Sequence, residues 1–176
     1  MPLLEDGRSV ADPWIAGTDG QPVPDTGPVL VPLERLRAEN AALTARGAPL
    51  GVALPNDAEV SDLIALLDGD VNRLDLITLT LPAFKDGRAY SQARQLRETH
   101  GYRGRLRAVG EVLRDQLAFL ARCGVDAVEI DHPDAEALWR AAVGEIDAVY
   151  QPTGDGRTPI PALRRHISPA RREDAA

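Results

Sequence analysis

The chain has one cysteine, few aromatic residues and no clustered histidines, and each shortage excludes a class of chemistry. Cys123 is the only cysteine, so one chain can form neither an internal disulfide nor a cysteine-ligated iron–sulfur cluster, which needs several thiolates. The three histidines are dispersed, and without a zinc-ligand spacing no metal site is predicted. Aromatic residues make up 4% of the chain, so the core must be mainly aliphatic. Cys123 follows a predicted helix and is expected to be a buried structural thiol.

Long apolar runs and common cofactor fingerprints are also missing. No run approaches the ~20 apolar residues that span a bilayer. The N-terminal residues show no signal-peptide pattern, so we expect a cytoplasmic protein without membrane contact. The motifs G-x-G-x-x-G, G-x-x-x-x-G-K-S/T and G-x-S-x-G are all absent. A flavin or nicotinamide site has no local support, and the cofactor, the substrate and the oligomeric state stay unassigned.

Three regions differ in composition. Residues 1–27 are rich in proline, glycine and aspartate and predict an irregular arm, with a short strand or hairpin near Trp14–Ile15. Residues 28–150 predict a single α/β domain. Residues 151–176 are rich in proline, glycine and arginine and predict a disordered tail.

Within residues 28–150, short apolar runs alternate with apolar residues at helical spacing. The runs predict strands at 29–33, 50–54, 76–81, 105–109 and 125–130, with a sixth at 146–150. This alternation indicates parallel βαβ units, hence a mostly parallel sheet of five or six strands with covering helices. Such a chain is too short for a complete eight-stranded barrel of ~250 residues. An open sheet with helices on both faces is therefore favoured, and a partial, barrel-like (βα) repeat is the alternative.

Residues 85–122 form a basic segment in an acidic protein. The whole chain has 20 basic and 27 acidic residues and a net charge of −7, whereas this segment has nine basic and four acidic residues. Lys85, within it, is the only lysine. A local charge opposite to the net charge suggests an anionic ligand or partner. The alternative is a pair of solvated helix faces.

The same segment carries a family resemblance. The stretches KDGRAYSQARQLR, GYRGRLRAVGEVLRDQLAFLARCGVDAVEI and, more weakly, VALPNDAEV resemble a bacterial family catalogued as domain of unknown function 934. The resemblance implies that members are encoded beside siroheme sulfite reductase and are labelled as oxidoreductases of sulfite reduction. It therefore implies a place in sulfate assimilation and cysteine biosynthesis, with sulfite reductase or its electron donor as partner.

Candidate site residues follow the predicted strands, at the edge where parallel α/β folds bind ligands. The residues chosen as an anion- or partner-binding set are Lys85, Asp86, Gly87, Arg88, Tyr90, Ser91, Arg107, Glu111, Arg114 and Asp115. We expect Lys85, Arg88 and Arg114 to converge on one anionic site, because Gly87 can adopt positive φ and allow close backbone approach.

Structural alternatives stand beside this site. The loop at 85–88 can equally be an ordinary turn with Asp86 as helix cap. Arg107 lies on a predicted strand, where it either points out of the sheet edge or pairs with an acid such as Asp115. The whole cluster can be a self-neutralised set of ion pairs.

Three functions are therefore compared. The first is an accessory protein of assimilatory sulfite reduction that binds the reductase or its electron donor through the basic edge. The second is an enzyme of sulfur assimilation, such as an oxidoreductase component, acting on a small anion or nucleotide. The third is a nucleic-acid-binding module, which the net charge of −7 and the scarcity of aromatic residues disfavour.

Overall fold

The computed structural model describes residues 2–18, 20–145, 148–151, 153 and 157–165. The strands are β1 (Leu3–Glu5), β2 (Arg8–Val10), β3 (Ile15–Ala16), β4 (Val29–Pro32), β5 (Leu50–Leu54), β6 (Leu76–Leu81), β7 (Arg105–Gly110) and β8 (Ala127–Glu129). The helices are α1 (Leu33–Thr44), α2 (Val60–Leu66), α3 (Arg88–Arg94), α4 (Arg114–Arg122), α5 (Ala135–Gly144) and α6 (Ile160–Arg165). A π-helical turn, Gln95–Thr99, extends α3.

One mixed sheet of eight strands, in the order β2-β1-β8-β7-β6-β5-β4-β3, runs through the protein. Strands β3 to β8 pair in parallel, while β1 pairs antiparallel with both β8 and β2. The predicted α/β class is confirmed. The strand number is eight rather than five or six, because residues 1–27 supply three short strands where a largely irregular arm was predicted. Of the predicted strand at 146–150, Ile146 and Asp147 lie outside the described residues, and residues 148–150 form no strand.

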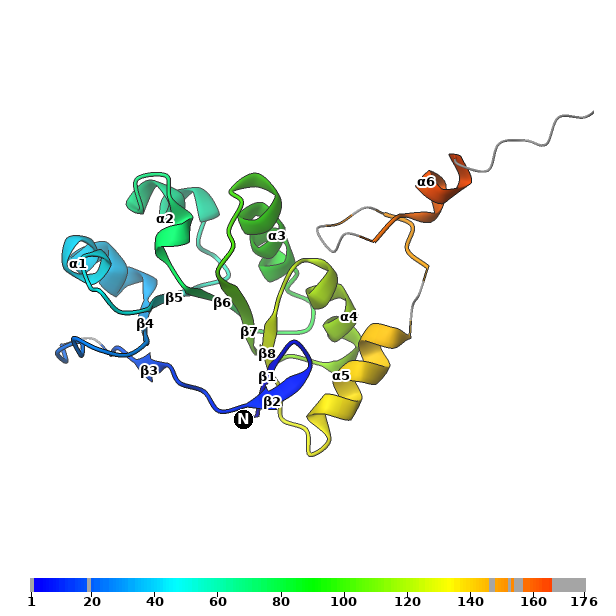
Figure 1. The fold of residues 1–176 in the computed structure, drawn as a ribbon, viewed down its shortest axis with the longest axis horizontal. Coiled ribbons are helices and arrows are strands. Elements are labelled where there is room, and N and C mark those ends of the chain that lie inside the picture. The colour runs from blue at the N-terminus through cyan, green and yellow to red at the C-terminus, as the bar shows by residue number, and fades with distance from the viewer. Residues whose placement is uncertain (1, 19, 146–147, 152, 154–156, 166–176) are drawn as a thin grey trace, which may run out of the picture.

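Alternate residues of the parallel strands build the core. In β6, Ile77, Leu79 and Leu81 are fully buried and belong to the main hydrophobic cluster. Helices α1 to α5 cover this outer, convex side of the sheet (Figure 1). Cys123 is buried in the same cluster, which confirms it as a core residue.

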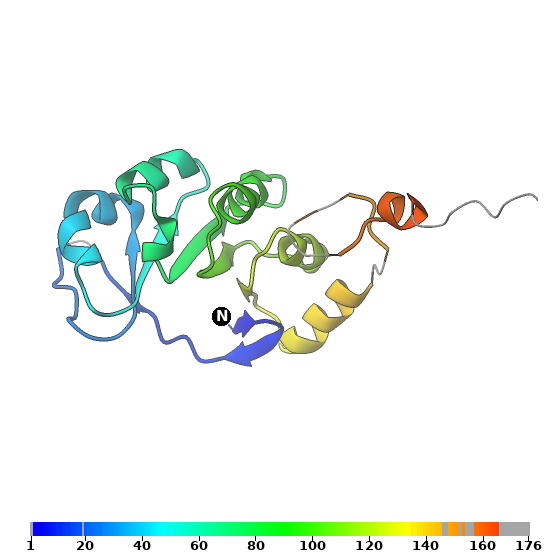
Figure 2. The same ribbon diagram turned by 45° about the horizontal axis from the view of Figure 1, so that its top comes forward.

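The favoured open sheet is wrong, because the sheet is curled into a half-barrel, which agrees with the partial-barrel alternative. The connection between its two edges shows why. Strands β2 and β3 lie at opposite ends of the strand order, yet only residues 11–14 join them. Eight flat strands at ~4.8 Å spacing would place these edges roughly 34 Å apart. A connection of this length spans at most roughly 18 Å. The sheet must therefore curl, and residues 11–14, here named the strap, cross its concave side (Figures 1 and 2).

The strap closes the concave side through two side chains. Asp12 reaches Arg107 on β7, near the middle of the sheet, with N–O distances of 2.8 and 3.0 Å. Trp14 lies against Gly51 of β5, where an added Cβ would be only 2.9 Å from the indole ring. These two contacts hold the strap against the concave side of the sheet.

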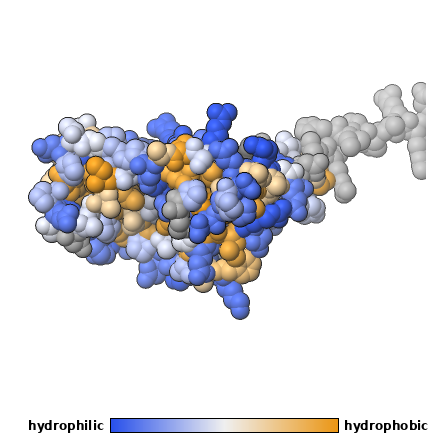
Figure 3. Space-filling view, turned by 90° about the horizontal axis from the view of Figure 1, so that it is seen from below, coloured by the Kyte–Doolittle hydropathy of each residue, from blue (hydrophilic) through white to orange (hydrophobic). Residues whose placement is uncertain are grey.

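Outside the half-barrel, the C-terminal region differs in part from its prediction. A disordered tail was predicted for residues 151–176, but the described part contains the short helix α6, whose first amide donates to the Val149 carbonyl at 2.8 Å. Residues 166–176 lie outside the described residues. Across the parts of the chain that the structure covers, no helix has the length and apolar character needed to cross a membrane. On the face shown in Figure 3, small apolar areas are separated by hydrophilic residues.

Candidate functional site

The C-terminal ends of the parallel strands form one edge of the half-barrel, and the predicted site residues were chosen for this edge. The loop after β6 carries Lys85 and Asp86, and the loop after β7 carries Glu111. The Glu111 amide donates to the Leu81 carbonyl at 2.8 Å, so the two loops leave neighbouring strands at paired positions. The structure therefore brings these two parts of the predicted set to one edge.

Asp86 is the centre of a hydrogen-bond network at this edge. Arg88 donates from Nε and Nη2 to the Asp86 carboxylate at 3.0 and 2.6 Å, and its backbone amide also donates at 3.2 Å. Asn56, from the loop after β5, donates to the same carboxylate at 2.6 Å. Gly87 has φ of −91°, so the positive φ expected of this glycine is not used. The capped turn, with Arg88 neutralised locally, is the arrangement present.

A titration prediction follows from this network. The Arg88 side chain, the Arg88 amide and Asn56 lower the pKa of Asp86 from 3.8 to about 2. Because this pKa is lowered, the interaction stabilises the fold above pH 3.8 and is lost as the pH falls through about 2. Replacing Arg88 by alanine should return the pKa toward 3.8. Carboxyl-carbon NMR titration measures both values, and a wild-type pKa near 3.8 contradicts the network.

Two small hollows flank the network. Arg88 and Ser91 line one of about 230 Å³, together with Asn56. Buried Gln92 also lines it and donates to two backbone carbonyls, while its Oε1 has no partner among the described residues. A second hollow of about 240 Å³ lies beside Thr80 and the ends of β4 and β5. Both are below the ~300–1,000 Å³ typical of small-molecule sites.

Exposed apolar side chains accompany the cations at this edge. Phe84 is 53% exposed and precedes Lys85, which is exposed and has no ion-pair partner in the described part of the chain. Leu113 is 45% exposed and precedes Arg114, whose guanidinium pairs with Glu145 at 2.8 Å. Apolar and cationic groups thus alternate along two neighbouring loops.

Five predicted site residues lie on the covering helices: Arg88 and Arg114 begin α3 and α4, and Tyr90, Ser91 and Asp115 follow them. Tyr90 packs against Phe119 with ring centroids 4.9 Å apart, which joins α3 to α4. Burial raises the pKa of Tyr90. Asp115 is exposed in the first turn of α4, and Ser91 is exposed on α3.

Arg107 is separated from the rest of the predicted set. Its side chain is 1% exposed on the concave side of β7, so it does not point out of the sheet edge. Its partners are Asp12 of the strap and Glu129 of β8, the latter at 3.4 Å, and not Asp115. Burial raises the pKa of Asp12, but hydrogen bonds from Arg107 and the Trp14 amide outweigh it, so this pKa is lowered.

Much of the remaining basic segment is also paired. Arg94 pairs with Glu98, and Arg105 pairs with Asp6 of the β1–β2 turn. Arg97 pairs with Asp126 at 2.6 Å. The excess of positive charge predicted from the sequence is therefore largely a set of ion pairs that join distant elements. Lys85 is the exception at the strand-end edge.

Sequence reasoning missed a groove between the β1–β2 turn and α5. It has a volume of about 720 Å³, and Arg8, Trp139 and Arg140 line it. No motif marks these residues. The turn lies beside α5 only because β1 pairs with β8, and the sequence of residues 1–27 did not predict that pairing.

The family model described as bacterial protein of unknown function (DUF934) matches residues 51–161. The chain belongs to this family. The DUF934 match begins in β5 and ends in α6, so it contains the loops of the strand-end edge. The β1–β2 turn and the strap lie outside the matched residues. A comparison with curated proteins found no match to the chain.

Proposed function

We propose that this DUF934 protein is an accessory protein of assimilatory sulfite reduction that docks onto sulfite reductase or its electron donor. The docking surface is the strand-end patch, defined as Phe84, Lys85, Arg88, Leu113 and Arg114. The resemblance described above, with members encoded beside siroheme sulfite reductase, supplies the partner. The exposed apolar and cationic side chains of the patch indicate how the protein binds that partner.

The observation that carries the proposal is the exposure of Phe84 and Leu113 among cations. Fully burying a Phe or Leu side chain contributes roughly 1.5–3 kcal/mol. Apolar anchors surrounded by polar side chains are typical of docking surfaces. Lys85 adds to these anchors a positive charge that is unpaired among the described residues, which favours an acidic surface on the partner and steers association.

An enzymatic role at the same edge has less support. The two hollows are small, and the charges of Asp86 and Arg88 are committed to each other. Nucleic-acid binding has less support as well, because most arginines of the basic segment are paired within the protein. Docking of a protein surface uses the exposed side chains of Phe84 and Leu113 and the unpaired charge of Lys85 at this edge.

The proposal predicts the effect of removing the apolar anchors. The variant Phe84→Ser with Leu113→Ser should weaken binding to purified sulfite reductase, or to its electron donor, by about tenfold or more. The matched control is Ile15→Ser, which removes an exposed apolar side chain from β3 at the sheet edge. Isothermal titration calorimetry measures the affinities, and melting temperatures report folding.

Three outcomes decide the test. If the double variant binds more weakly and the Ile15→Ser control does not, with unchanged melting temperatures, the result supports the patch as docking surface. Equal binding by the double variant and the wild type contradicts the patch as docking surface. Absence of wild-type binding to both partner proteins contradicts the accessory function itself.

A further inference from the structure

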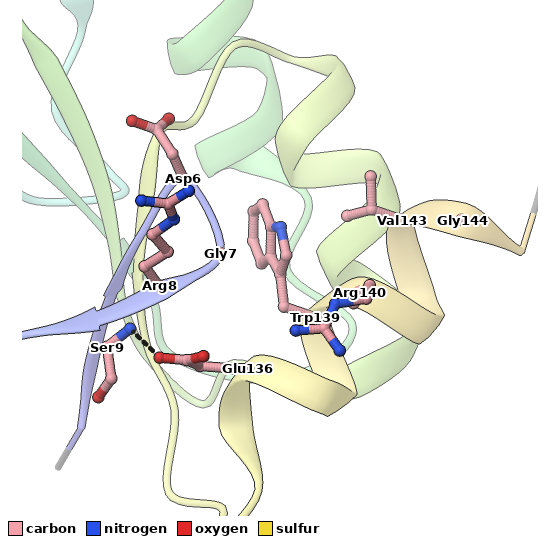
Figure 4. A pocket seen from close by; sticks show the side chains of 9 residues that line it. All are labelled: Asp6, Gly7, Arg8, Ser9, Glu136, Trp139, Arg140, Val143 and Gly144. Atoms are coloured by element: carbon pink, nitrogen blue, oxygen red, sulfur yellow. Dashed lines mark hydrogen bonds between the residues drawn. The ribbon is translucent and has the colours of Figure 1, made fainter.

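The largest groove described above lies between the turn of the β1–β2 hairpin and helix α5 (Figure 4). The Asp6 amide donates to the Asp126 carbonyl, just before β8 begins, so the turn stands at the starting ends of the parallel strands. The groove is therefore at the opposite edge of the sheet from the strand-end patch. Its volume of about 720 Å³ lies within the ~300–1,000 Å³ of small-molecule sites.

Both acidic side chains of this groove are committed to other groups. Asp6 accepts from Arg105 of β7 at 2.9 Å. Glu136 accepts from the Ser9 amide at 2.7 Å, the contact drawn in Figure 4. Glu136 is four residues before Arg140 on α5, yet it forms no ion pair with it, because its carboxylate is turned to the hairpin. Among the described residues, these contacts leave the groove with two cations and no acid that pairs with them.

Arg8 and Arg140 are the two cations. Among the arginines of the described residues 2–18 and 20–145, only Arg8, Arg103 and Arg140 have no ion pair and no side-chain hydrogen bond. Two of these three line one groove, one from the hairpin and one from α5. Guanidinium groups bind phosphate and sulfate oxygens through paired N–H donors, so two free guanidiniums in one groove suit such an anion.

Trp139 lines the same groove from α5, with its indole turned toward the hairpin (Figure 4). The hairpin turn approaches its indole closely at Gly7, which has φ of +78°, and a Cβ there would be 2.4 Å from Trp139 Cδ1. Any other residue would push the turn away from α5. The half-buried indole gives the groove an aromatic surface against which a ring can pack.

We propose that this groove is a binding site for a phosphate or sulfate ester of nucleotide size. Arg8 and Arg140 hold the oxyanion, and Trp139 packs against the organic part. A free inorganic anion would contact the cations but leave most of the groove empty. This site is independent of the strand-end patch and of the proposed docking function.

Intrinsic fluorescence can test the site, because Trp14 and Trp139 are the only tryptophans. The variant Trp14→Phe leaves Trp139 as the single reporter. The probes are ADP, adenosine, inorganic phosphate and inorganic sulfate, each titrated into the full chain, with calorimetry on the unmodified protein as a second measurement. We expect saturable binding of ADP, and binding of adenosine and of both inorganic anions that is weaker by about tenfold or more.

Matched arginine variants decide whether the binding belongs to the groove. Arg8→Ala and Arg140→Ala should each weaken ADP binding by about tenfold. Arg103→Ala, which removes the third unpaired arginine away from the groove, should leave it unchanged. The proposal is overturned if ADP does not bind, if the inorganic anions bind as tightly as ADP, or if all three variants bind ADP alike.

Discussion

Replacing Arg97 by alanine is expected to lower the free energy of unfolding by about 3 kcal/mol. The guanidinium donates to the carbonyls of Gly124, Tyr102 and Gly104 at 2.9, 2.6 and 2.9 Å, and to Asp126 at 2.6 Å. Its side chain is only 17% exposed. The alanine variant therefore leaves an acid and three carbonyl groups without this donor in a partly buried place.

The matched control is Arg94→Ala, one turn earlier in the same helical segment. Arg94 pairs with Glu98 at 2.9 Å but is 46% exposed, and such surface pairs contribute roughly 0.2–1 kcal/mol. Denaturant unfolding of both variants measures the difference. If the Arg97 variant loses no more stability than the Arg94 variant, the structural role assigned to Arg97 is wrong.

Replacing Asp12 by alanine should also lower the free energy of unfolding by about 3 kcal/mol. The guanidinium of Arg107 is 1% exposed, and its Nε already has no partner among the described residues. Without Asp12, only Glu129 at 3.4 Å would face this buried charge. The strap would also lose its polar contact with the sheet, so residues 11–14 should become easier to cleave by protease.

A double-mutant cycle with Arg107→Met tests whether the unpaired buried charge of Arg107 causes the loss of stability. Removing the arginine alone leaves acids that are partly exposed and can be hydrated, and methionine fills similar space. The double variant Asp12→Ala with Arg107→Met should therefore be more stable than Asp12→Ala alone. If the free energy of unfolding of the double variant falls by as much as those of the two single variants together, the buried charge of Arg107 is not the cause.

The local sequence pattern was sufficient to predict the parallel strands of the fold. The leucine- and β-branched-rich runs at 50–54 and 76–81 are strands with the predicted bounds, because both sides of these strands are buried. Of the three strands of the arm, only β3 was predicted, as a short strand near Trp14–Ile15. They are two or three residues long, and β1 is a strand because of its pairing with β8, more than a hundred residues away in the chain.

The same limit, that partners distant in the sequence are not predicted by local pattern, applies to the charged residues of the site. The basic segment was correctly identified as unusual, but the acids that neutralise it are distant in sequence. Arg105 and Arg107 are 99 and 95 residues from Asp6 and Asp12, their acidic partners. The Asp86–Arg88 and Arg94–Glu98 pairs, two and four residues apart, are the local ones. Fold topology, and not local composition, decides which cations stay free.

Hydrogen exchange with and without the partner tests the docking account most directly. On adding saturating sulfite reductase, or its electron donor, the account predicts protection of backbone amides in the strand-end loops at 83–88 and 111–115. Amides of the β1–β2 turn at the opposite edge should exchange as in the free protein. Unchanged exchange in both strand-end loops, with protection confined to other surfaces, would contradict the account.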